Sequence, residues 1–305
     1  PLGLRLRTMY ALGYSRDSVF QRSFATLKRY NDSCYKVVLM KSCRLPGFEE
    51  IGIIKTGKRN SAGNTKKLDA SVSRTKSRVT ELALCNPWEY FVTLTLSPEK
   101  FNRNDLPIFK KHLSKFLNNL RFRYGWAIKY LLIPEQHKDG AWHMHGLFMG
   151  IPKSELTLFS LHDHLPMRVL RMLGEGRQIM NWSRYAASFG YVTCEPIRNL
   201  EATAKYITKY ITKDLVSSQV GLNKKLYLCS QGLNRAETIC RGHIVNDFQP
   251  DFCNDYVAIK TFKTEEEALA LFVDDNEGHS FPISFDDIFQ RFSNGGTNWT
   301  TYPQT

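Results

Sequence analysis

The stretch Ala141-Trp142-His143-Met144-His145-Gly146-Leu147-Phe148 decides how this sequence is read. It is apolar except for two histidines separated by one residue, and it has the composition of a β-strand. Because side chains alternate faces along a strand, His143 and His145 lie on one face and Met144 lies on the other. Two imidazoles side by side are a common way to hold a divalent metal ion.

A second apolar run, from Tyr130 to Pro134, precedes this stretch and ends at Glu135. The segment between the two runs closes with Asp139-Gly140, a strong signal for a β-hairpin. Such a hairpin places Glu135 opposite His143. We therefore predict a metal site formed by Glu135, His143 and His145.

The flanking residues indicate the fold class. Residues 89–97 alternate with period two, which predicts a strand that faces the core through its apolar side chains and leaves Thr93 and Thr95 on the opposite face. Asn104 or Asp105 begins an amphipathic helix that ends at Gly125. The order strand, helix, strand, strand predicts an α+β fold with an antiparallel sheet backed by helices.

A helix further along the chain carries a repeated tyrosine and lysine pattern. After a strand over residues 190–196, Asn199 caps a helix that contains Tyr206-Ile207-Thr208-Lys209-Tyr210-Ile211-Thr212-Lys213. Tyr206 and Tyr210 are four residues apart and share a helix face. Tyrosines at this spacing usually pack in a core, but the accompanying lysines are costly to bury.

Residues 151–190 are predicted to be a helical or loop insertion that shapes a cleft. They contain a second histidine pair, His162-Asp163-His164, which has no carboxylate hairpin beside it. We therefore do not assign this pair to the metal site.

Composition limits the classes of partner. The chain has 305 residues, a formal net charge of +13 and a hydrophobic fraction of 42%. Such a basic excess predicts a polyanionic partner, nucleic acid before membrane, and no apolar run reaches the ~20 residues of a membrane span. The seven cysteines form no Cys-x-x-Cys pair, which fits a reducing cytosol and disfavours a zinc knuckle or a disulfide framework.

Together these motifs resemble those of the HUH endonucleases, and among them the rolling-circle replication initiators of phages and plasmids. The resemblance rests on Phe91-Val92-Thr93-Leu94-Thr95, on Glu135 with His143-Met144-His145, and on the two Tyr-x-x-Lys units, in the family's order. It implies a ferredoxin-like or RRM-like central antiparallel sheet with flanking helices. It also implies an HUH endonuclease domain over residues 81–235, flanked by a basic accessory segment (1–80) and a small appendage (236–305).

The resemblance implies a nickase and ligase with nucleotidyltransferase chemistry. Glu135, His143 and His145 would hold Mg²⁺ or Mn²⁺, and Tyr206 and Tyr210 would act as nucleophiles that form a 5′-phosphotyrosyl link to DNA. Lys209 and Lys213 would stabilise the phosphate or orient the phenolate. The expected substrate is single-stranded DNA at a replication origin in the cytoplasm of a bacterial host. A host polymerase and helicase would then extend the strand, since the chain has no Gly-x-x-x-x-Gly-Lys-[Ser/Thr] loop.

Three alternatives remain open from the sequence. A two-tyrosine transposase or relaxase would use the same chemistry. A non-catalytic, RRM-like nucleic-acid binder would carry exposed aromatic residues on its central strands in place of histidines. A metal-dependent hydrolase would use water as its nucleophile and would not need the tyrosines. Residues 55–78 are also open, either as a phosphate-contacting arm or as a solvated linker.

Overall fold

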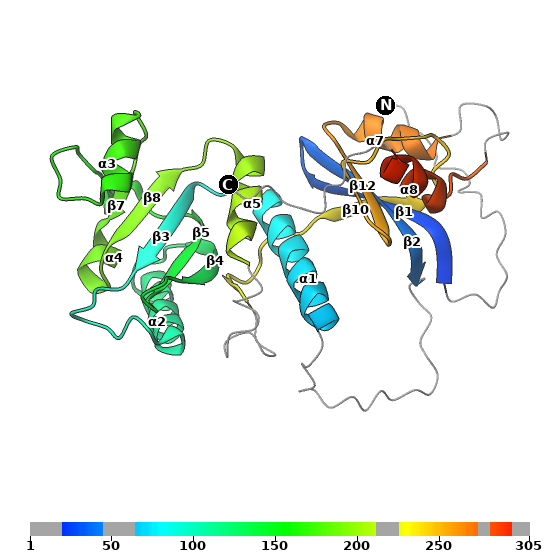
Figure 1. Ribbon diagram of the computed structural model, residues 1–305. Coiled ribbons are helices and arrows are strands. Elements are labelled where there is room, and N and C mark those ends of the chain that lie inside the picture. The colour runs from blue at the N-terminus through cyan, green and yellow to red at the C-terminus, as the bar shows by residue number, and fades with distance from the viewer. Residues whose placement is uncertain (1–19, 45–64, 212–225, 274–280, 295–305) are drawn as a thin grey trace. The chain divides into compact units, whose positions relative to one another are not determined.

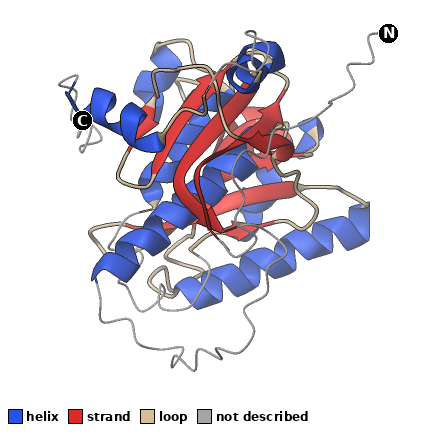
Figure 2. Ribbon diagram, turned by 90° about the vertical axis from the view of Figure 1, so that its right-hand side faces the viewer, coloured by secondary structure: helices blue, strands red, loops and turns tan. Residues whose placement is uncertain are grey.

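The computed structural model describes residues 20–44, 65–211, 226–273 and 281–294 (Figure 1). The chain divides into two compact units, one over Thr56–Arg235 and one that combines Pro1–Lys55 with Ala236–Thr305. Both units contain helices and antiparallel strands, which Figure 2 distinguishes by colour. The predicted α+β class, with antiparallel sheets and flanking helices, is confirmed, and it is consistent with an RRM-like fold.

The unit over Thr56–Arg235, here called the central unit, is built on a seven-stranded sheet. Its strand order is β6-β7-β8-β3-β5-β4-β9, so that β5 lies between β3 and β4. The strands are β3 (Tyr90–Thr95), β4 (Lys129–Gln136), β5 (Trp142–Met149), β6 (Leu156–Leu158), β7 (Met180–Trp182), β8 (Val192–Pro196) and β9 (Leu228–Cys229).

Helices cover both faces of this sheet. On one face, α2 (Leu106–Tyr124) and α4 (Ser183–Ser188) pack through Phe116 and Tyr185 around Trp182, which also contacts Phe148 of β5. Towards the other face lie α1 (Thr65–Leu84), α5 (Leu200–Ile207) and the 3-10 turn η2 (Thr208–Tyr210); α1 and α5 contact each other. The connection between β6 and β7 contains α3 (Met167–Gly174), and η1 (Lys153–Glu155) precedes β6.

The boundaries of α2 follow from its sequence. Asp105 caps the helix, because its side chain accepts a hydrogen bond from the backbone N–H of Ile108 at 2.9 Å. Gly125 ends it in the left-handed conformation, with φ of 67°, which glycine adopts without steric cost. The predicted start and end of this helix are therefore confirmed.

The terminal unit combines segments from both ends of the chain. Its five-stranded sheet has the order β10-β1-β2-β12-β11, and helices α7 and α8 lie beside it (Figure 1). Its elements are β1 (Phe20–Asn31), β2 (Cys34–Arg44), β10 (Glu237–Gly242), β11 (Phe252–Cys253), β12 (Val257–Phe262), α7 (Glu265–Leu269), η3 (Ala270–Phe272) and α8 (Phe285–Asn294). Its core contains Leu27, Val37 and Leu39 from the sheet and Phe285 and Ile288 from α8.

This grouping differs from the segments expected from the sequence, which separated residues 1–80 from residues 236–305. In the structure β1 pairs with β10, and β2 pairs with β12. Pairing between strands about two hundred residues apart leaves no local pattern. The strand pattern of β1 itself is obscured, because consecutive residues from Phe24 to Leu27 are all buried.

Candidate active site

The two histidines of the Trp142–Met149 strand lie on one face of the central sheet, and the strand register sets their neighbours. His143 pairs with Thr95 of β3 on one side and with Glu135 of β4 on the other. His145 pairs with Thr93 on the β3 side. Since paired residues of antiparallel strands point to the same face, Glu135 and both threonines lie beside the histidines. The pairing of Glu135 with His143 is the one that the Asp139-Gly140 hairpin predicts.

Glu135 and His145 make the closest contact in the group. The Nε2 atom of His145 lies 2.7 Å from Oε2 of Glu135. His145 is buried, and its Nε2 makes no hydrogen bond of good geometry. A buried nitrogen that faces a carboxylate in this way fits a shared metal ion, because both groups would donate lone pairs to it.

A third histidine, His137, joins this group. Its Nε2 lies 3.5 Å from Oε2 of Glu135, and its ring stacks on that of His143 with 3.7 Å between centroids. Ligand atoms of Glu135, His137 and His145 lie within 4.8 Å of one another, and this is the metal-type cluster found in the part of the chain that the structure describes. His143 belongs to the same row, with its ring 6.3 Å from that of His145.

Sequence reasoning missed His137, although a signal existed. His137 follows Glu135 by two residues at the end of a strand, and this spacing places both side chains on one face. The residues present thus offer one carboxylate and three imidazoles, a donor set that suits Mn²⁺ and other borderline cations better than Mg²⁺.

Threonines of β3 orient two of these imidazoles. The hydroxyl of Thr93 lies 3.1 Å from Nδ1 of His145, and the hydroxyl of Thr95 lies 3.3 Å from Nδ1 of His143. With Nδ1 engaged, Nε2 of each ring is the nitrogen left to bind a metal ion. Partners of this kind fix ring orientation and tautomer in metal sites.

The electrostatics of the group keep its lone pairs available. Burial and the neighbouring His137 and His145 lower the pKa of His143 to about 4, so this imidazole is neutral at physiological pH. The contact with His145 lowers the pKa of Glu135, which keeps the carboxylate ionised. A neutral imidazole and an ionised carboxylate are the forms that bind metal ions.

The two tyrosines lie against the same histidines. The ring of Tyr210 stacks on that of His145, with 4.2 Å between centroids, and the ring of Tyr206 packs edge-on against Phe91 of β3. The Tyr210 hydroxyl donates a hydrogen bond of 2.9 Å to the Tyr206 hydroxyl. The predicted helix ends earlier than expected, since α5 stops at Ile207 and Tyr210 lies in η2, but the tyrosines remain adjacent.

The tyrosine hydroxyls differ in their surroundings. Burial, followed by the hydrogen bond to Tyr206, raises the pKa of Tyr210. Arg168 of α3 makes a hydrogen bond with Tyr206, which raises the pKa of the arginine. The Tyr206 oxygen therefore receives the Tyr210 hydroxyl and has a guanidinium beside it, an arrangement that stabilises negative charge on Tyr206.

Arg168 is the second residue that sequence reasoning missed. It lies in the 151–190 segment, where no period or motif distinguishes one arginine from another. Of the two predicted lysines, Lys209 is exposed and its Nζ lies 5.7 Å from the centroid of the Tyr206 ring. Lys213 lies outside the described residues.

The second histidine pair does not join the cluster. His162 and His164 are exposed and lie between β6 and α3. The structure thus adds Arg168, and neither of these histidines, from the 151–190 segment to the tyrosine side of the site.

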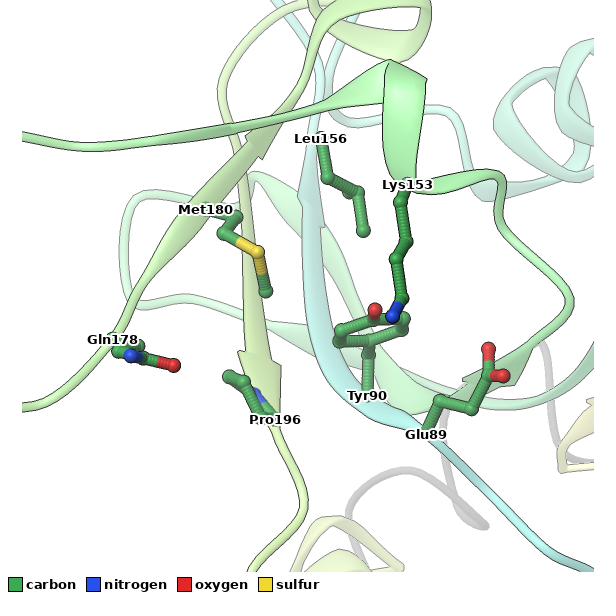
Figure 3. Close-up of a pocket in the computed structure, with 7 residues that line it drawn as sticks. All are labelled: Glu89, Tyr90, Lys153, Leu156, Gln178, Met180 and Pro196. Atoms are coloured by element: carbon green, nitrogen blue, oxygen red, sulfur yellow. The ribbon is translucent and has the colours of Figure 1, made fainter.

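A shallow pocket of about 450 Å³ lies elsewhere on the central unit (Figure 3). It is lined by residues that include Tyr90, Lys153 and Pro196, at the end of β3 opposite Thr95. Figure 3 shows the Lys153 amine close to the Tyr90 ring and no histidine among the labelled side chains. None of its lining residues belongs to the histidine and tyrosine cluster, so the pocket and the cluster are separate.

Comparison with known proteins gives a match over the central unit. Residues 89–215 match the model of a family described as replication-associated protein, of the ORF2 type. The matched segment contains Glu135, all three clustered histidines, Arg168 and both tyrosines. No curated protein and no solved structure matches the chain. None of the helices in the described ranges has the length and apolar character needed to span a lipid bilayer.

Proposed function

We propose that this protein is a replication initiator that nicks and rejoins single-stranded DNA at an origin, through a covalent tyrosine intermediate. The observation that carries the proposal is the contact of the Tyr206 and Tyr210 pair with His145, beside the cluster of Glu135 and histidines. The family match over residues 89–215 supports a role in replication. The strand-transfer chemistry rests on the residues themselves.

Glu135, His143 and His145 hold a divalent cation in this proposal, and His137 is close enough to contribute. When bound, Mn²⁺ or Mg²⁺ would polarise the scissile phosphate and offset charge as the tyrosine attacks. Thr93 and Thr95 keep the imidazoles in the orientation that presents Nε2 to the cation.

Tyr206 is the first nucleophile in this scheme. Its oxygen accepts the hydrogen bond from Tyr210 and lies beside the Arg168 guanidinium, so ionisation of Tyr206 is favoured over ionisation of Tyr210. The phenolic oxygen of Tyr206 bonds to phosphorus as the bond from phosphorus to the 3′ oxygen breaks. The phenol loses its proton and the leaving oxygen gains one, which leaves a free 3′-OH and a 5′-phosphotyrosyl link.

Tyr210 serves the closing step. A second tyrosine within hydrogen-bond distance of the first can attack a new phosphate while the first DNA end stays attached. The closing reaction conserves the energy of the phosphodiester bond, because one phosphoryl ester replaces another without hydrolysis. Host polymerase and helicase would use the free 3′-OH between the two steps.

The test is covalent trapping. The protein is incubated with Mn²⁺ and single-stranded oligonucleotides that tile its own replicon, and adducts are separated on a denaturing protein gel. We expect an adduct with the wild-type protein, a strongly reduced initial rate with Tyr206→Phe, a smaller loss with Tyr210→Phe and no adduct with the double variant. Cleavage without an adduct would favour the water-dependent hydrolase. Binding without cleavage or adduct would favour the non-catalytic binder.

A further inference from the structure

The two faces of the terminal unit's sheet differ in charge. One face packs against α7 and α8, and its core residues include Leu27, Val37 and Leu39. The cations on that side are paired with carboxylates. Arg29 contacts Asp32 at 2.5 Å, Lys41 contacts Asp286 at 2.9 Å, and Lys260 contacts Asp251 at 3.0 Å.

The opposite face, here called the open face, is set by the strand register. Its residues alternate with those of the core along each strand, and the helices described in this unit pack on the other side. In the widest row, Thr26 pairs with Arg241 and with Val38, and Ile259 links Val38 to Phe252. The next row places Lys28 directly opposite Lys36.

Four cations lie on the open face, and within the described residues none is paired with a carboxylate. They are Arg22, Lys28, Lys36 and Arg241. Two lysines directly opposite each other on neighbouring strands repel, which costs stability unless an anion lies between them. Their lateral neighbours are the uncharged Thr238 and Thr261, so the sheet supplies no such anion.

Aromatic and apolar side chains lie among these cations. Phe252 at the sheet edge is 42% exposed, and Lys36 lies over the ring of Tyr30 at 4.8 Å from its centroid. A sheet face that combines unpaired cations with accessible rings is typical of surfaces that bind single strands, because phosphates contact the cations and bases stack on the rings.

We propose that the open face of the terminal unit binds single-stranded DNA, as a second nucleic-acid site in addition to the nicking site. The choice of single-stranded DNA among polyanions rests on the proposed function, whereas the need for a polyanion rests on the unpaired charge of the face. A site of this kind holds a DNA strand in a way that needs no metal ion and no tyrosine.

The experiment measures binding by the full-length protein in EDTA, where metal-dependent cleavage is stopped. Fluorescence anisotropy follows a labelled single-stranded oligonucleotide of mixed sequence over a range of salt concentrations. The test variant combines Arg22→Gln, Lys28→Gln, Lys36→Gln and Arg241→Gln. The matched control removes the same charge from exposed positions of α2, as Lys111→Gln, Lys115→Gln, Arg121→Gln and Arg123→Gln.

Each phosphate contact with a single strand contributes about 0.7 to the slope of log affinity against log salt. We therefore expect the slope of the open-face variant to fall by about 3 if all four cations contact phosphates, and its affinity to fall at least tenfold more than that of the α2 control. Photocrosslinking with an iodouracil-containing strand should label peptides of β1, β2 or β11.

Equal losses for the two variants would show that binding follows net charge and would overturn the proposal. So would crosslinks confined to residues 89–215, or a loss of affinity for RNA of the same sequence without a loss for DNA. The nicking assay separates the two proposals. A wild-type protein that forms no adduct but loses binding in the open-face variant would refute the proposed function alone.

Discussion

The threonines of β3 provide the sharpest test of the metal site. Thr93→Val and Thr95→Val keep the shape of each side chain and remove the hydroxyl that lies 3.1 Å from Nδ1 of His145 or 3.3 Å from Nδ1 of His143. Neither substitution removes a proposed ligand. Any change in metal affinity would therefore act through the orientation of the imidazole ring.

The expected magnitude follows from the hydrogen-bond lengths. Loss of such a partner weakens metal binding by about 10- to 100-fold, or about 1.4 to 2.7 kcal/mol. Both distances lie at the long end for hydrogen bonds that involve a hydroxyl, so we expect each single variant near tenfold. The double variant should approach 100-fold, since the two threonines contact different rings.

Isothermal titration calorimetry with Mn²⁺ on the DNA-free protein measures this effect. Thr193→Val is the matched control, because Thr193 pairs with Thr93 across β8 and β3. Its hydroxyl makes no hydrogen bond to either histidine among the described contacts. Unchanged Mn²⁺ affinity in both β3 variants would refute the assignment of these threonines as positioning residues for the metal ligands.

Three further outcomes are expected. Arg168→Gln should slow adduct formation about 10- to 100-fold at saturating Mn²⁺ with Mn²⁺ affinity unchanged, whereas an effect on affinity alone would contradict its place beside Tyr206. Gly146→Ala should lower the free energy of unfolding in urea by about 1–3 kcal/mol or more, because its Cβ would lie 2.1 Å from the Leu131 carbonyl oxygen; Gly174→Ala, with open space around it, should be near neutral. In EDTA, stability should fall as the pH drops from about 6.5 through 4, since the folded-state pKa of His143 is about 4 and protonation favours the unfolded chain; a His143→Gln protein whose pH profile is no flatter would contradict this.

The sequence predicts the central unit well, because its signals are local. The alternation around Thr93, the Asp139-Gly140 turn and the cap at Asn199 each act within a few residues, and the structure contains the corresponding strand, hairpin and helix start. The Asn199 side chain accepts a hydrogen bond from the backbone N–H of Ala202 at 2.9 Å, as its position predicts.

The remaining features depend on contacts that no local pattern encodes. The approach of Arg168 to Tyr206 joins the insertion between β6 and β7 to the start of η2 and depends on the tertiary fold. The join of β1 to β10 spans most of the chain. His137 is the exception, since its spacing from Glu135 was readable and the hairpin interpretation assigned it to the turn.

The division of the terminal unit between the two ends of the chain has a consequence for synthesis. The β1–β2 hairpin leaves the ribosome first, but the strands that complete its sheet, β10 and β12, follow about two hundred residues later. At typical translation rates this delay is roughly ten to forty seconds. The central unit, which is continuous from Thr56 to Arg235, can fold during that interval. Until then the apolar face formed by Leu27, Val37 and Leu39 has no α7 or α8 to cover it, which makes the nascent hairpin a natural client for a chaperone.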